Sequence, residues 1–240
     1  MDGGQDYSPD LSKLSPSQLQ DWADAVAELY CSYEIVDGIQ MDLEPFAGKY
    51  KAPFLLFLKA LSANLRSPER NCASPTHPSG RSITTFLFAE SLSPEVWDAL
   101  GPNGFVSVSG YDLSAAPAGV PSTPAFFSNA LAASIATATA SAAAANGSFF
   151  VGIPAAASAH EFESYTLANG TVIKGSPQQE YVKGALAALA SGAKGAPGYL
   201  GPALWGFSSE MSYPPHSNNF FLPGNPFADA GEEALLEASL

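Results

Sequence analysis

The chain has little positive charge. Its 240 residues include only 10 Lys and Arg against 23 Asp and Glu, and the formal net charge at pH 7 is −13. A surface of this sign repels polyphosphates and anionic lipid headgroups. The composition therefore argues against nucleic acid and against an anionic membrane as partners.

Long apolar runs and a leader-like start are also lacking. No charged residue occurs between Asp112 and Glu161, but the middle of this stretch, residues 129–146, is mainly Ala, Ser and Thr. A membrane span needs about 20 strongly apolar residues, so this segment predicts a buried Ala-rich helix instead. Residues 1–6 lack the basic and apolar regions of a signal peptide, so secretion would require a signal upstream.

Cysteine and histidine are scarce as well. Cys31 and Cys72 permit one disulfide at most, and their spacing suits no metal site; the sequence favours two unpaired thiols. The three His are scattered, and no G-x-S-x-G is present, which argues against a serine hydrolase. We expect neither a metal nor a cofactor. Asn146-Gly147-Ser148 and Asn169-Gly170-Thr171 are N-glycosylation sequons, a triplet that also arises by chance.

What the sequence does contain is an alternation of short apolar strands with helices. Strands are expected over residues 36–43, 83–89, 105–110, 149–153 and 199–207. Helices are expected over residues 15–35, 53–66, 93–97, 177–191 and 232–240, and from 123 through the Ala-rich segment. Such alternation predicts an α/β fold with a parallel sheet, either closed as a (β/α) barrel or open and doubly wound. No Gly-rich phosphate loop follows any strand, which disfavours a nucleotide-binding sheet.

The most informative segment is Asp37-Gly38-Ile39-Gln40-Met41-Asp42-Leu43-Glu44-Pro45. Strand alternation places Gln40, Asp42 and Glu44 on one face. A solvent-facing edge strand would show the same pattern, but the strongly apolar helices on both sides indicate a central strand. Its polar groups would then gather at the carboxyl end, before the proline. Two carboxylates about 7 Å apart on one face can have separated pKa values, as a general acid requires.

Asp37-Gly38-x-Gln40-x-Asp42-x-Glu44 resembles the DGxDxDxE strand motif of glycoside hydrolase family 18, the chitinases and chitinase-like proteins. Three later segments follow in that family's order. Ser109-Gly110-Tyr111-Asp112 is similar to the Met-x-Tyr-Asp segment on barrel strand six. Val151-Gly152-Ile153-Pro154 is similar to the Gly-Leu-Pro segment on strand seven. Gly201-Pro202-Ala203-Leu204-Trp205 is similar to the strand-eight segment that ends in Trp.

The resemblance covers about residues 15 to 210 and implies one domain over residues 1–240. That domain would be a parallel (β/α) barrel of TIM type. Its five βα units match strands four to eight, and the first three strands are missing from the pattern. A truncated catalytic domain, a fragment and a partial barrel all fit this expectation.

The resemblance also implies a role for each matched residue. Glu44 would be the general acid, and Asp42 would orient the substrate's N-acetyl group, whose carbonyl oxygen attacks the anomeric carbon in place of an enzyme nucleophile. Tyr111 would hydrogen-bond that group, Asp112 would support a sugar hydroxyl or the acid, and Trp205 would stack on a pyranose ring.

Two further residues complete the candidate site. Gln40 stands where the family has Asp, so the like charge that would help Asp42 to hold a proton is absent. Glu90 follows the strand over 83–89 and would reach the same mouth, with a place beside a helix N-cap as the alternative. We therefore expect a retaining, substrate-assisted glycosidase acting on an N-acetylhexosamine-containing or related polysaccharide. The alternative is a catalytically silent, carbohydrate-binding relative.

Overall fold

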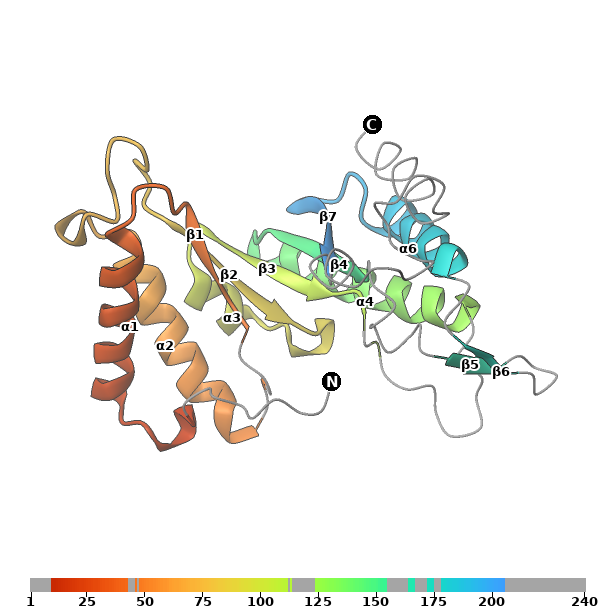
Figure 1. The fold of residues 1–240 in the computed structure, drawn as a ribbon, viewed down its shortest axis with the longest axis horizontal. Helices are drawn as coiled ribbons and strands as arrows, with labels where there is room; N and C mark the ends of the chain where they lie inside the picture. Colours follow the sequence, from red (N-terminus) through yellow and green to blue (C-terminus); the bar gives the residue numbers. More distant parts are fainter. Residues whose placement is uncertain are drawn as a thin grey trace. The chain divides into compact units, whose positions relative to one another are not determined.

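The computed structural model describes residues 10–42, 46, 48–111, 113, 124–154, 164–166, 172–174 and 178–205. Five strands form a parallel sheet in the order β1-β2-β3-β4-β7. They are β1 (Gly38–Met41), β2 (Ser82–Leu87), β3 (Gly104–Ser109), β4 (Phe149–Pro154) and β7 (Tyr199–Trp205). The longer helices are α1 (Pro16–Cys31), α2 (Lys51–Asn64), α3 (Pro94–Leu100), α4 (Pro124–Ala145) and α6 (Gln178–Gly192) (Figure 1).

The α/β class and the parallel sheet expected from the sequence are confirmed. Within the described residues, each expected helix and strand is present, with its ends shifted by a few residues. The expected helix over 232–240 lies outside the described residues. A two-stranded antiparallel ribbon, β5 (Ser164–Thr166) with β6 (Val172–Lys174), is an element that the sequence reading did not include. None of the described helices is long and apolar enough to cross a membrane.

The position of β1 in the sheet differs from the expectation. Among the described strands β1 stands at one end of the order and pairs with β2, so the prediction of a central strand is wrong for this part of the chain. The apolar helices on either side of β1 in the sequence pack on one face of the sheet. Their apolar character therefore indicates that helices cover one face of β1, and it does not indicate that strands flank β1 on both sides.

The chain divides into two compact units, of which the first comprises Met1–Leu87 and Ser91–Val106. In it α1 and α2 lie side by side on the same side of β1 and β2 (Figure 1). Helix α1 begins as the sequence predicts: Ser15 is the N-cap, and its hydroxyl accepts a hydrogen bond from the Gln18 N–H at 3.3 Å. Trp22 stacks on Phe57 with ring centroids 4.4 Å apart, and Trp97 is buried, so both tryptophans serve packing.

The second unit comprises Phe88–Glu90 and Ser107–Leu240. Here α4 and α6 pack against each other through small residues. A Cβ atom added at Gly184 of α6 would meet the Ser128 hydroxyl of α4 at 2.1 Å, so the two helices approach as closely as glycine allows. The Ala-rich composition of α4 thus serves helix packing. β7 tolerates Pro202 because it is the other end strand of the described sheet and its register with β4 shifts there.

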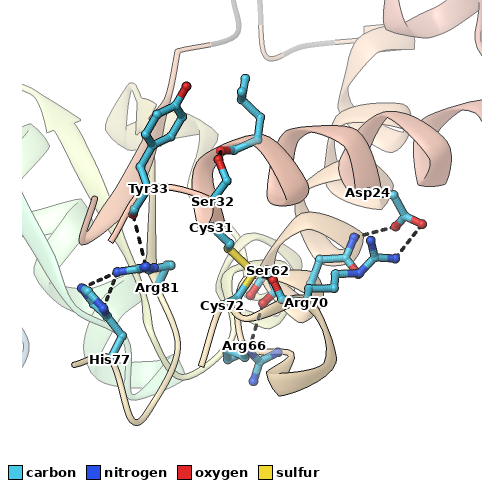
Figure 2. The surroundings of a disulfide bond; sticks show 12 residues. Asp24, Cys31, Ser32, Tyr33, Ser62, Arg66, Arg70, Cys72, His77 and Arg81 are labelled. Carbon is cyan, nitrogen blue, oxygen red and sulfur yellow. Dashed lines mark hydrogen bonds and ion pairs between the residues drawn. A yellow bond between two sulfur atoms is a disulfide. The ribbon is translucent and has the colours of Figure 1, made fainter. Parts of the chain in front are cut away.

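Cys31 and Cys72 form a disulfide (Figure 2), so the expectation of two unpaired thiols is wrong. Cys31 is the last residue of α1, and Cys72 follows the short helix η3 (Pro68–Arg70). Both sulfur-bearing residues are buried, and their Cα atoms lie 4.9 Å apart across a sequence separation of 41. Tertiary packing brings them together, which the spacing of two cysteines cannot reveal.

A buried arginine, Arg81, fixes the connection between α1 and β1 to the start of β2 (Figure 2). Its guanidinium donates hydrogen bonds to the carbonyl oxygens of Tyr33 and Glu34, each at 3.3 Å. The guanidinium also contacts the ring of His77, whose Nε2 lies 2.9 Å from the Asp37 carboxylate. The chain just before β1 is therefore held by groups from the loop that follows α2.

Asp24 of α1 makes a second set of contacts near the disulfide (Figure 2). Its carboxylate accepts a hydrogen bond from the Asn64 side-chain amide of α2 at 2.7 Å and forms an ion pair with Arg70 of η3, also at 2.7 Å. One carboxylate thus joins three elements, and it places η3 where Cys72 can reach Cys31.

Replacing both Cys31 and Cys72 by Ala should lower the free energy of unfolding by about 2–4 kcal/mol, because the disulfide restricts the unfolded chain. Urea denaturation of the wild type and of the variant, with and without reductant, measures this loss. Reductant should shift the wild-type midpoint toward that of the variant and leave the variant unchanged. An equal response of both proteins would contradict the assignment.

Candidate functional site

The first group of candidate residues lies on β1. This strand runs parallel to β2, with Gln40 beside Thr84 and Met41 beside Thr85. Ile39 is buried, whereas Gln40 and Asp42 are exposed, so the alternation that the sequence predicts is present. Asp42 comes directly after Met41, the last residue of β1. Gln40 and Asp42 therefore mark the carboxyl end of a parallel strand.

The first two residues of the same motif have a structural part at the amino end of β1. The Asp37 carbonyl oxygen accepts a hydrogen bond from the Ser82 N–H at 2.9 Å. A Cβ atom at Gly38 would lie 2.2 Å from the Ser82 hydroxyl, so only glycine fits between the two strands. Asp37 and Gly38 thus position β1 beside β2. The candidate functional side chains of the motif are those that follow, Gln40 and Asp42.

Asp42 combines exposure with a perturbed pKa. Its side chain is solvent-accessible, yet the surrounding chain removes enough water that desolvation raises the pKa of the carboxyl above its usual value of 3.8. Among the described residues no hydrogen bond or ion pair offsets this effect. A carboxyl group whose pKa is shifted by desolvation is one feature by which candidate functional sites are recognised.

The second unit holds Tyr111 just beyond the carboxyl end of β3. The Tyr111 N–H donates to the Ser109 hydroxyl at 3.4 Å, and that hydroxyl donates to the Tyr111 carbonyl oxygen at 2.5 Å. The ring is buried against β4: a Cβ atom at Gly152 would lie 3.2 Å from Tyr111 Cε1. Gly110 approaches β4 too, since its Cβ would meet the Gly152 carbonyl oxygen at 2.3 Å. The absence of side chains at Gly110 and Gly152 therefore leaves the space that the Tyr111 ring occupies.

Trp205 is the last residue of β7, and its backbone pairs with Pro154 at the end of β4. Tyr111 follows β3 and Trp205 ends β7, the two strands on either side of β4, so both residues belong to the carboxyl edge of the sheet within the second unit. Glu90 lies in the short helix η4 (Ala89–Ser91) after β2 and is exposed. Glu44 and Asp112 lie outside the described residues.

The predicted site residues thus form two groups that the structure describes separately. Gln40 and Asp42 share the end of β1 in the first unit, and Tyr111 and Trp205 follow β3 and end β7 in the second. Sequence reasoning missed Ser109 and Gly152, the two residues that hold Tyr111. Both residues belong to segments that resemble the family, so the sequence marks the segments. Nothing in either segment shows that Gly152 lies against the Tyr111 ring.

In the part of the chain that the structure describes, no group of three His, Cys, Asp or Glu side chains is arranged to hold a metal ion. No protein-family model matches the chain, and neither a curated protein nor a solved structure matches it significantly.

Asp42→Asn should raise the free energy of unfolding at neutral pH. The folded-state pKa of Asp42 lies above its unfolded value, so between the two the folded chain binds more protons, and wild-type stability falls as pH rises through the folded pKa. The difference in the free energy of unfolding between the variant and the wild type should therefore increase with rising pH and vanish below about pH 4. Urea midpoints measured across pH test this.

Asp21→Asn, on the exposed face of α1, is the matched control, because it removes the same charge from a chain whose net charge is −13. If both variants gain the same stability at every pH, general charge repulsion explains the effect and the desolvation of Asp42 does not.

Gly152→Ala should cost about 1–3 kcal/mol of stability, because its methyl group forces the Tyr111 ring to move. Thermal unfolding and the near-ultraviolet circular dichroism of tyrosine report the cost and the displacement. In a Tyr111→Ala background the same substitution should cost much less. Equal costs in both backgrounds would show that the ring contact is not the cause.

Proposed function

We propose that this chain is a glycoside hydrolase-like protein of TIM-barrel type. It cleaves an N-acetylhexosamine-containing or related polysaccharide by a retaining, substrate-assisted route. The observation that supports this most is Asp42, a carboxyl group with a raised pKa at the carboxyl end of a parallel strand, next to Gln40. In (β/α) barrels the catalytic residues come from the carboxyl ends of strands.

The arrangement of elements is compatible with the barrel type. Helices follow four of the five parallel strands, as α2 follows β1, α3 follows β2, α4 follows β3 and α6 follows β4. Such βα units pack their helices on one face of a curved sheet and leave the other face for side chains of the interior. Gln40 and its neighbour Thr84 lie on the face opposite the buried Ile39.

The chemistry assigns each carboxyl group a separate task. Glu44, which the resemblance makes the general acid, donates a proton to the leaving glycosidic oxygen. The substrate's acetamido oxygen attacks the anomeric carbon, and Asp42 hydrogen-bonds the acetamido N–H so that the oxygen points at that carbon. Desolvation raises the pKa of Asp42, which makes its carboxylate a stronger acceptor for this N–H.

The remaining candidates bind sugar. The resemblance gives them these roles: Tyr111 for the acetamido group, Trp205 for a pyranose face, and Asp112 for a hydroxyl or the acid. Glu90, exposed after β2, contacts a neighbouring sugar unit. An uncharged polysaccharide suits a chain whose own charge is −13, because it adds no repulsion.

The disulfide supports a place outside the cytosol. Disulfides persist in oxidising compartments and are rare in reducing ones, so Cys31–Cys72 favours a secreted protein or a secretory compartment. An extracellular polysaccharide does not cross a membrane, so an enzyme that cleaves such a polymer acts outside the cytosol.

One observation favours the alternative, a silent carbohydrate-binding protein. Gln40 is exposed beside Asp42 and carries no charge, so it cannot share a proton with that carboxyl group as an aspartate would. Such a site binds the acetamido group through hydrogen bonds without turning the sugar over.

Glu44→Gln tests the proposal directly. The amide keeps the shape of the side chain but has no transferable proton, so hydrolysis of an N-acetylglucosamine oligosaccharide should fall by about 10²- to 10⁴-fold while sugar binding survives. Product release measured by chromatography and binding measured by calorimetry separate the two effects. An unchanged rate would show that the assigned mechanism is wrong.

Gln40→Asp is the companion variant, and it restores the family motif. It should shift the pH optimum of hydrolysis, because the new carboxylate shares a proton with Asp42. If neither the wild type nor any variant turns sugar over and all of them bind it, the silent carbohydrate-binding function replaces the enzymatic one.

A further inference from the structure

The turn between α4 and β4 carries the triplet Asn146-Gly147-Ser148, which the proposed reaction does not use. Asn146 directly follows α4, with a left-handed φ of 52°. The Gly147 N–H donates to the Ala142 carbonyl oxygen at 2.8 Å, the bond that closes a Schellman motif at a helix end. After glycine, asparagine is the residue that most readily takes this left-handed position. The backbone of Asn146 therefore ends the helix.

The side chains of the triplet are not needed for this turn. Asn146 is exposed and Ser148 is half-buried. Within the described ranges, neither the Asn146 amide nor the Ser148 hydroxyl makes a hydrogen bond. A glycine would adopt this left-handed conformation at least as readily as Asn146. The fold therefore explains the positive φ of Asn146 but not the presence of its exposed side-chain amide.

An exposed Asn with a Ser two positions later is the acceptor sequence for N-linked glycosylation, provided that the chain enters the secretory compartment. The Cys31–Cys72 disulfide supplies a separate indication of that compartment, because the same oxidising lumen forms disulfides and glycosylates chains. Two unrelated features of the chain thus agree.

We infer that Asn146 is an N-glycosylation site. The co-substrate is a polyprenyl-diphosphate-linked oligosaccharide, used by the transferase of the secretory compartment. The Asn146 Nδ2 atom attacks C1 of the reducing-end sugar and a C–N bond forms. The bond from C1 to the diphosphate oxygen breaks, the polyprenyl diphosphate leaves with the electron pair, and the amide proton passes to a basic group of the transferase.

The glycan lies away from the candidate site. Asn146 precedes β4, whereas Gly152, against which Tyr111 packs, lies near the carboxyl end of that strand. From Phe149, where β4 begins, to Gly152 the strand alone rises roughly 10 Å, at about 3.3 Å per residue. An oligosaccharide on Asn146 therefore projects from the amino end of β4 and leaves the Tyr111 end open.

The full chain, expressed behind a secretion signal in yeast, tests the inference. Total translocated protein is treated with peptide N-glycosidase F in ¹⁸O-labelled water, which converts glycosylated Asn to labelled Asp, and peptides are read by mass. Most of the peptide containing residue 146 should carry the label. Asn169-Gly170-Thr171, outside the described residues, is read in the same digest as an internal reference for entry into the lumen.

Three variants separate the modification from the helix end. Asn146→Gly keeps the left-handed turn and removes the acceptor, and Ser148→Ala keeps Asn146 and removes the hydroxyl, so both should lose this glycan completely. Ser148→Thr should retain it. Unfolding temperatures of Ser148→Ala and Asn146→Gly, which both lack this glycan, should agree or favour the glycine variant. An unlabelled residue 146 overturns the inference, whether or not Asn169 is labelled, and leaves Asn146 as a helix-ending residue only.

Discussion

The buried guanidinium of Arg81 is the constraint on which the placement of β1 depends. It holds the two carbonyl groups that precede β1 and contacts His77, which in turn bonds the Asp37 carboxylate. A buried charge is costly unless it is hydrogen-bonded, so this segment cannot leave Arg81 without a large loss of free energy. Because the chain before β1 is fixed, the register that sets Gln40 beside Thr84 is fixed as well.

The disulfide and the Asp24 contacts act on the same region from the other side. Cys31–Cys72 joins the end of α1 to the loop that also carries His77, and Asp24 joins α1 to α2 and η3. The amino end of β1 is therefore the rigid end of the strand. Its carboxyl end holds Asp42, whose pKa is raised by desolvation.

In the second unit, small residues hold Tyr111 in place and allow strands and helices to approach closely. Gly110 and Gly152 let β3 and β4 approach so that the Tyr111 ring is buried between them, and Ser109 fixes the Tyr111 backbone through two hydrogen bonds. Gly184 allows α6 to approach α4. The scarcity of charge in this part of the chain follows from the same geometry, because long charged side chains would separate the helices.

The sequence by itself determined the longer helices, the strands of the parallel sheet, their order, the α/β class and the alternation on β1. Periodicity, N-caps and prolines act over a few residues, so a local pattern reveals them. It also indicated Asp42 as a candidate, since strand alternation fixes which residues share a face. Only the tertiary structure decided that Cys31 meets Cys72, that β1 is an end strand of the described sheet, and that Gly152 receives Tyr111. Each of these joins residues more than 40 positions apart, and which distant segments meet depends on how whole helices and strands pack, a property that no local pattern contains.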